Sequence, residues 1–239
     1  MACFVLVHGA FHGGWVWSRV AARLRAAGHG VITPTLTGCG DRYHLLTRDV
    51  GLATHVDDLV ATLEHEDVRA GVLVGHSYGG TVITAAAARA PARVARLIYL
   101  DAQAPLDGQT ASGAMGDATA TTLAGLTDDS WQLPPLPLDV VGVVDPADVA
   151  WVAPRRHPHP LRTLLEPVAL GAGALAGLPR AYVACTQHAA LAALFGADPL
   201  APFVERARRE GWPLAHLDAP HDVMVTDPAA AAAALLAHA

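Results

Sequence analysis

Cysteine is scarce in this chain of 239 residues, and its scarcity argues against disulfide-rich and zinc-binding proteins. The three cysteines, Cys3, Cys39 and Cys185, form an odd and widely spaced set, so the sequence indicates neither a disulfide framework nor a zinc site. Histidine is plentiful, at 13 residues, but His157 and His159 are not accompanied by an H-x-x-x-H or H-E-x-x-H pair. We therefore expect no metal site.

Charge is also sparse, since only 16% of the residues are Asp, Glu, Lys or Arg and the net charge is −6. The chain has no Lys/Arg-rich cluster with interleaved aromatic residues, so we expect neither a nucleic acid nor a membrane as partner. The N-terminal apolar run has no basic region before it, and the apolar segment 167–179 is too short to span a bilayer. These features predict a cytoplasmic protein.

Apolar residues make up 52% of the chain, and they fall into strand patterns that alternate with helix patterns. A chain of this length suits one α/β domain with a modest insertion. The predicted strands cover residues 3–7, 30–33, 72–74, 96–100, 180–185 and 212–217, and the predicted helices cover residues 15–27, 52–66, 78–89 and 228–239. This order predicts a doubly wound, six-stranded and mostly parallel sheet.

The composition changes between residues 105 and 179. This segment is rich in Pro, Gly and Thr, carries Trp131 and Trp151, and shows no strong strand pattern. We predict that residues 1–104 and 180–239 form the core. Residues 105–179 then form a cap over the carboxyl ends of the strands, where open α/β sheets bind ligands. The apolar character of the cap predicts a hydrophobic pocket with few polar groups.

The most informative stretch covers residues 71–80, G-V-L-V-G-H-S-Y-G-G. It contains G-x-S-x-G, the nucleophile elbow, between a predicted strand and a predicted helix, which is the context that the motif requires. Gly75 and Gly79 permit the tight turn, and the turn holds Ser77 in a strained conformation that exposes its hydroxyl. The helix that follows directs backbone amides and its positive dipole end at an oxyanion. Ser77 is therefore the predicted nucleophile.

A serine nucleophile needs a base and an oxyanion hole. His221 follows the last predicted strand, which suits the base in the chain order Ser, then Asp or Glu, then His. One oxyanion donor should be the amide of Tyr78, directly after the nucleophile. The other should come from the glycine-rich loop after the first strand, at Ala10.

Six stretches together make the chain resemble an α/β-hydrolase of the group that contains plant methyl esterases, hydroxynitrile lyases and their bacterial esterase relatives. They are F-V-L-V-H-G-A-F-H-G-G-W (4–15), L-T-G-C-G-D-R (36–42), G-H-S-Y-G-G (75–80), Y-L-D-A-Q-A-P (99–105), Y-V-A-C-T (182–186) and H-D-V-M-V-T-D-P (221–228). The resemblance implies a six-stranded parallel sheet, a small cap, no cofactor, and ester hydrolysis through an acyl-serine intermediate.

The chain departs from that group at positions that matter for the chemistry. Lyase members carry Thr where this chain has Gly9 and Lys where it has Asp222. Those residues handle the cyanohydrin and the leaving cyanide, so the resemblance implies an esterase rather than a lyase. Plant members also carry the triad aspartate shortly after the Cys-Thr of the fifth strand, whereas residues 185–188 here are C-T-Q-H.

The acid that orients His221 consequently has two candidates. Asp101 ends the strand that follows the nucleophile strand, at the same edge of the sheet, and is our first prediction. Asp198 is the alternative, and it would serve if residues 188–197 are an insertion that delays the usual aspartate. A Ser–His pair without an acid is the third arrangement.

These residues predict a serine carboxylesterase that hydrolyses a small hydrophobic or aryl ester, with methyl esters as leading candidates. Two alternatives stay open. The first is a lyase or cyclase that uses His221 as base without an acyl-enzyme, and the second is a small-molecule receptor that keeps the fold without turnover. The expected partner is a small hydrophobic ester substrate. The sequence leaves the oligomeric state open, with a homodimer as one outcome.

Overall fold

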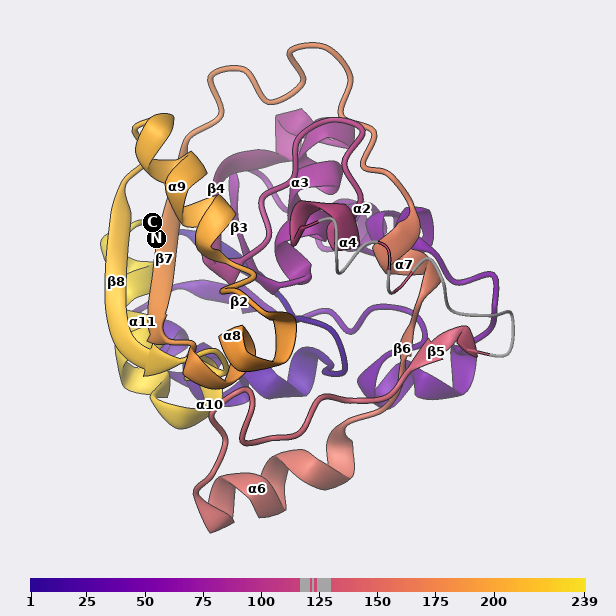
Figure 1. Cartoon of the computed structure of the whole chain (residues 1–239). Coiled ribbons are helices and arrows are strands. Elements are labelled where there is room, and N and C mark those ends of the chain that lie inside the picture. The colour runs from indigo at the N-terminus through magenta and orange to yellow at the C-terminus, as the bar shows by residue number, and fades with distance from the viewer. Residues whose placement is uncertain (117–120, 122, 124–129) are drawn as a thin grey trace.

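The computed structural model describes residues 1–116, 121, 123 and 130–239, and Figure 1 shows how its elements are arranged. Six strands form one sheet in the order β2-β1-β3-β4-β7-β8, and every neighbouring pair is parallel. The strands are β1 (Cys3–Val7), β2 (Gly30–Ile32), β3 (Gly71–Ser77), β4 (Val94–Ala102), β7 (Arg180–Gln187) and β8 (Leu214–Pro220). The predicted doubly wound, six-stranded parallel sheet is confirmed.

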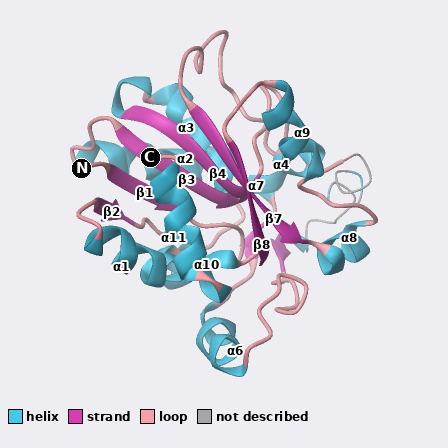
Figure 2. Ribbon diagram, turned by 90° about the vertical axis from the view of Figure 1, so that its left-hand side faces the viewer, coloured by secondary structure: helices cyan, strands magenta, loops and turns pink. Residues whose placement is uncertain are grey.

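Helices pack on both faces of this twisted sheet (Figure 2). Outside the segment between β4 and β7, the described helices are α1 (Ser18–Ala26), α2 (Leu52–His65), α3 (Gly79–Arg89), α8 (Ala189–Phe195), α9 (Ala201–Arg209), α10 (Val223–Thr226) and α11 (Pro228–Ala237), with 3₁₀ turns η1 (Gly14–Trp17), η2 (Gly40–Leu45) and η3 (Pro91–Arg93). Because side chains alternate along a strand, each strand contributes apolar side chains to two hydrophobic cores, one on each face of the sheet. In β1, Phe4 and Leu6 pack with α1 and α11, whereas Val5 and Val7 pack with α2 and α3.

Between β4 and β7 the chain leaves the sheet. The described part of this segment holds α4 (Ala111–Ala114), β5 (Gln132–Leu133), α6 (Pro146–Val152), η5 (Ala153–Arg155), β6 (His159–Pro160) and α7 (Arg162–Leu165). β5 and β6 pair with each other and not with the main sheet. Trp151 packs edge-on against Trp15, with ring centroids 5.3 Å apart, so α6 is fastened to the core. Residues 117–120, 122 and 124–129 of the predicted cap lie outside the described residues.

Two local expectations differ from the structure. The helix predicted from residue 15 begins as the 3₁₀ turn η1 and becomes α-helical only at Ser18. In addition, α8 and α9 occupy a region in which the sequence analysis predicted no element. α8 has only seven residues and ends at Gly196, whose φ is +79°, so it is too short for a helical repeat of apolar residues to stand out. No helix in the described part of the chain has the length and apolarity of a membrane span.

The turn between β3 and α3 requires glycine for steric reasons. A Cβ atom added to Gly75 would lie 2.6 Å from the backbone of Gly79 and Gly80. A Cβ atom added to Gly79 would lie 2.6 Å from the carbonyl oxygen of Val7. Both distances are shorter than real Cβ contacts, so any larger residue would force strand and helix apart. The role that the sequence analysis assigned to these glycines is confirmed.

We expect Gly75→Ala to destabilise the protein by about 1–3 kcal/mol or more, because the backbone around the turn must move to admit the methyl group. Gly30→Ala is the matched control, since a Cβ atom there would have its nearest neighbour at 3.8 Å. Urea unfolding of both variants measures the difference. Equal unfolding midpoints for the two variants would contradict the steric argument.

Candidate active site

Ser77 lies at the end of β3 with a φ of +52°, a backbone conformation that residues other than glycine rarely adopt. α3 begins two residues later, at Gly79. The strand therefore turns into the helix within a single residue, as the nucleophile-elbow motif predicts. Ser77 lines a cavity together with His221, which follows β8.

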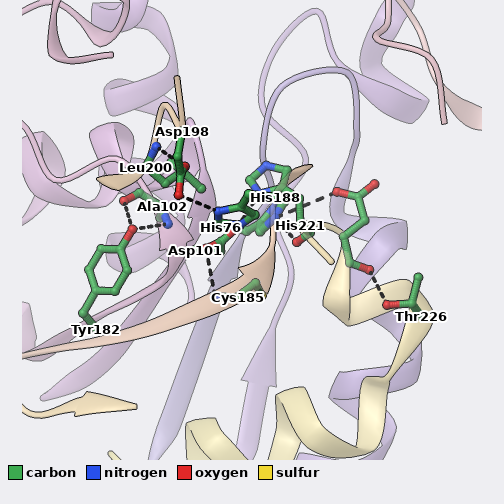
Figure 3. A network of polar contacts seen from close by, with 11 residues as sticks. His76, Asp101, Ala102, Tyr182, Cys185, His188, Asp198, Leu200, His221 and Thr226 are labelled. Atoms are coloured by element: carbon green, nitrogen blue, oxygen red, sulfur yellow. Dashed lines mark hydrogen bonds and ion pairs between the residues drawn. The ribbon is translucent and has the colours of Figure 1, made fainter. Parts of the chain in front are cut away.

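Asp101 lies near the end of β4, the neighbour of β3 in the sheet, and is completely buried. Its Oδ2 lies 2.6 Å from Nδ1 of His221, which donates the hydrogen bond (Figure 3). Because an ionised carboxylate can only accept, this contact places the proton of the neutral imidazole on Nδ1 and leaves Nε2 as the basic nitrogen. Of the two predicted acids, Asp101 is the one that contacts His221.

Three donors converge on the Asp101 carboxylate. His221 and His188 share Oδ2, at 2.6 and 2.8 Å, and the amide of Cys185 donates to Oδ1 at 3.0 Å. Burial by itself would raise the pKa of Asp101, but the hydrogen bonds and charges of the two histidines outweigh burial and lower this pKa to about 2. The carboxylate is therefore ionised at neutral pH, the state that can stabilise an imidazolium.

Asp198, the alternative acid, contacts a different histidine. Its Oδ2 lies 3.0 Å from Nδ1 of His188, and its Oδ1 accepts a hydrogen bond from the amide of Leu200. Nε2 of the same His188 donates to Asp101. Figure 3 shows the resulting chain, in which Asp198 reaches His221 only through His188 and Asp101.

Ala10 and Tyr78, the predicted oxyanion donors, both line the cavity beside Ser77. The loop that carries Ala10 is held by His8, whose Nδ1 donates to the carbonyl of Gly9 at 2.8 Å. Nε2 of His8 accepts from the amide of Leu36 at 3.1 Å. Burial lowers the pKa of His8 to about 3, so the imidazole stays neutral and keeps one donor and one acceptor.

His76 and Asp222 also lie next to His221. Nε2 of His76 donates to the backbone carbonyl of His221 at 3.0 Å. Asp222 is fully buried, and its Oδ2 lies 3.3 Å from Nε2 of His12. Asp222 is absent from the described lining of the cavity, so the residue at the position of the lyase lysine pairs with His12 instead of facing the pocket.

The structure also leaves no room for the lyase threonine. A Cβ atom added to Gly9 would lie 2.9 Å from Cβ of Ser77 and 3.0 Å from Nδ1 of His76. Any side chain at position 9 would therefore push against Ser77.

A cavity of about 430 Å³ opens at Ser77 and His221. Its other described lining residues are mostly apolar and come from three regions: Ala10, Phe11, Tyr78 and Gln103 at the sheet edge; Met115, Leu123, Leu133, Pro134, Leu136 and Leu164 from the segment between β4 and β7; and Leu191, Leu194, Phe195, Pro199 and Leu200 from α8 and the loop after it. The predicted hydrophobic pocket is confirmed. The contribution of α8 was not predicted.

Two groups of buried ligating side chains in the described part of the chain lie close enough together to hold an ion. They are His76, His221 and Asp222, and Asp101, His188 and His221. In the second group both histidines already donate to Asp101, so their contacts are those of a hydrogen-bond network. The absence of a functional metal stays a prediction.

The sequence analysis missed three residues that shape this site: His8, His188 and Tyr182. The hydroxyl of Tyr182 donates to the carbonyl of Ala102 at 2.8 Å and accepts from the amide of Ala102 at 3.1 Å. It thereby braces the backbone directly after Asp101, whose φ is +47°. Tyr182 begins one of the family-like stretches and His188 follows its end, but neither position by itself indicates a contact with the end of β4.

Comparison with known proteins identifies the family of this chain. The model of the alpha/beta hydrolase family matches residues 4–235. A carbendazim hydrolyzing esterase from Nocardioides sp. (strain SG-4G) is 38% identical over 95% of this chain and 96% of its own length. An alpha-hydroxynitrile lyase from Arabidopsis thaliana is 37% identical, over only 43% of this chain and 40% of its own.

Solved structures show the same fold. An extracellular alpha/beta-hydrolase from a Paenibacillus species aligns with a TM-score of 0.79 at 23% identity, covering 100% of this chain and 99% of that chain. The family resemblance inferred from the six sequence stretches is thus confirmed, with a family match that covers nearly the whole chain. This chain belongs to the alpha/beta hydrolase family.

Proposed function

We propose that the protein is a serine carboxylesterase with Ser77 as nucleophile, His221 as general base and Asp101 as the acid that orients His221. The observation that carries the proposal is the 2.6 Å contact between Nδ1 of His221 and buried Asp101, beside the cavity that Ser77 lines. An imidazole held by an ionised carboxylate is oriented and stabilised for taking the proton of a serine. Full-length similarity to a carbendazim hydrolyzing esterase supports carboxylic ester hydrolysis as the class of reaction.

In the proposed mechanism, Oγ of Ser77 attacks the ester carbonyl carbon while Nε2 of His221 takes the hydroxyl proton. The amides of Ala10 and Tyr78 stabilise the oxyanion at the positive end of α3. His221 then gives the proton to the alcohol oxygen, and the alcohol leaves with the acyl group still on Ser77. A water activated by His221 attacks this acyl-enzyme, and collapse of the second oxyanion releases the acid and restores Ser77.

We propose a small hydrophobic or aryl ester, methyl esters included, as the substrate. The cavity volume of about 430 Å³ falls in the range of small-molecule sites, and its lining is mostly apolar. In this proposal residues 105–179 act as a cap on the core formed by residues 1–104 and 180–239. Leu133, Leu136 and Leu164 support it, since they bring this segment to the cavity wall.

Every role in the proposed mechanism belongs to a side chain, a backbone amide or water, so the proposal needs no cofactor.

We also propose that the enzyme works in the cytoplasm. All three cysteines are free thiols, and Cys39 and Cys185 are buried. Unpaired thiols are typical of a reducing compartment.

Hydrolysis of short p-nitrophenyl esters tests the nucleophile. We expect turnover by the wild type and a loss of about 10⁶ in kcat for Ser77→Ala, because no other group forms the acyl-enzyme. Ser18→Ala, at an exposed serine at the start of α1, is the matched control and should keep wild-type activity.

Two results would contradict this assignment. One is turnover that persists in Ser77→Ala. The other is product formation with no acyl-Ser77 adduct detectable by mass spectrometry after rapid quenching, which would favour the lyase or cyclase alternative. Carbendazim assayed beside the esters would show whether the substrate class extends to the compound named in the relative.

The choice of acid has its own test. We expect Asp101→Asn to lower kcat by about 10⁴, because the amide no longer holds the required tautomer of His221. Asp198→Asn should lower kcat by about fivefold or less, the equivalent of ~1 kcal/mol for a partly exposed ion pair. Steady-state kinetics at pH 7 compares the two, and the reverse order of effects would identify Asp198 as the acid.

A further inference from the structure

The proposed mechanism uses one of the two histidines that bind the buried acid, and the second, His188, is left without a role. Nε2 of His188 lies 2.8 Å from Oδ2 of Asp101, the same oxygen that binds His221. The side chain of His188 is only 7% exposed, and its ring lies 6.2 Å from that of His221. A buried histidine at this distance can affect the charge and the orientation of Asp101, and through Asp101 the orientation of His221.

His188 is held between two carboxylates. Its Nε2 faces Asp101, and its Nδ1 lies 3.0 Å from Oδ2 of Asp198. A neutral imidazole can donate from one nitrogen only, so one of these contacts would set a nitrogen lone pair against a carboxylate. Burial would lower the pKa of His188, but the hydrogen bonds and charges of Asp101 and Asp198 outweigh it and raise the pKa to about 9. His188 is therefore an imidazolium at neutral pH.

This cation offsets the cost of burying the acid. Asp101 is 0% exposed, and a carboxylate removed from water without a cationic partner is strongly destabilised. His221 cannot be that permanent partner, because the base must be neutral before it takes a proton from Ser77. A second histidine that stays charged keeps Asp101 ionised and in place throughout the cycle.

We propose that His188 is a positioning residue for the proposed esterase reaction: its imidazolium, held by Asp198, fixes the Asp101 carboxylate in the orientation that His221 needs. This inference rests on the proposed function. In this proposal four residues form one hydrogen-bonded network that extends from the protein surface to the base (Figure 3). They are Asp198, His188, Asp101 and His221. The segment between His188 and Asp198 includes α8, whose Leu191 and Phe195 line the cavity. The ion pair between His188 and Asp198 therefore also stabilises one wall of the cavity.

The groups that face this network from the neighbouring elements do not add an alkaline transition near pH 9. The titratable groups that face this network from the neighbouring elements are His76 on β3, Tyr182 and Cys185 on β7, and Asp222 after β8. Burial lowers the pKa of His76 to about 3 and raises the pKa values of Tyr182 and Cys185. The pKa of Asp222 is lowered, since the nearby histidines outweigh its burial. None of the four changes charge as His188 loses its proton.

The test compares kcat, KM and their pH dependence for the wild type, His188→Gln and Asp198→Asn with a p-nitrophenyl ester. Below pH 9 the wild type carries the His188 cation, so its kcat should fall as pH rises through about 9. The amide that replaces the imidazole in His188→Gln could donate to Asp101 but carries no charge. We expect this variant to lose about 10- to 100-fold in kcat, with KM changed by no more than about twofold and no limb near pH 9.

Asp198→Asn is the second variant, and it decides the outcome if His188→Gln does not fold. The Asp198 side chain is 36% exposed, so its loss is tolerated more easily. Removing one of the two carboxylates that hold the proton should move the alkaline limb to lower pH. His65→Gln, at the exposed end of α2, is the matched histidine control and should change nothing. A merely structural role would leave the pH profile of every folded variant unchanged.

NMR of ¹⁵N-histidine-labelled protein reads the state of His188 without reference to activity. Both ring nitrogens should carry protons at pH 7 and titrate near pH 9, and Asp198→Asn should lower this midpoint. Wild-type kcat and an unchanged alkaline limb in folded His188→Gln would overturn the inference, as would a singly protonated His188 at pH 7. Near-wild-type turnover by Ser77→Ala would instead overturn the proposed function, so the two failures are distinguishable.

Discussion

The buried carboxylate of Asp101 is the constraint on which the organisation of this site depends. A charge removed from water needs donors on every side, and here they come from different elements. Cys185 supplies an amide from β7, His221 reaches in from the turn after β8, and His188 from the residue before α8. A single side chain therefore ties four parts of the chain together at one edge of the sheet.

Two residues with strained backbone conformations lie at the same edge. Ser77 and Asp101 stand at the ends of neighbouring strands with φ values of +52° and +47°, each at a cost of about 1–3 kcal/mol. Local contacts offset this cost, since the amide of Gln103 donates to the carbonyl of Ser77 at 3.0 Å and Tyr182 bonds both backbone groups of Ala102. The pairing of β3 and β4 shifts register just before Ser77. Ser77 and Asp101 are both residues for which we propose chemical roles.

His221 lies on the boundary between two kinds of environment. On one side is the cavity, lined mostly by leucine, phenylalanine and proline side chains. On the other are buried polar groups, including Asp101, His76 and Asp222. Electrostatic interactions are stronger in such a water-poor setting, so a charge that develops on the imidazole is felt by fixed partners instead of being screened. An ester would be bound by apolar contact and transformed by these charges.

Much of this arrangement was predictable because it depends on short-range physics. Alternation of strand and helix patterns is a local property, and so is the crowding that demands glycine at 75 and 79. The proposed nucleophile, the proposed base and the two proposed oxyanion donors could therefore be placed at the strand ends from the sequence. By contrast, α8 escaped prediction because a seven-residue helix shows too little periodicity.

By itself, the sequence determined the sheet, the tight turn at Ser77 and the position of His221 after the last strand, since each follows from neighbouring residues. Only the tertiary structure decided between Asp101 and Asp198 as the partner of His221. Asp101 is 120 residues away from His221 in the chain, and their contact depends on which strand ends meet. Asp198 is closer in sequence, but the turn of the chain at α8 directs it to His188 instead. That histidine carried no signal in the sequence, because its charge exists only where the fold brings two carboxylates to one imidazole.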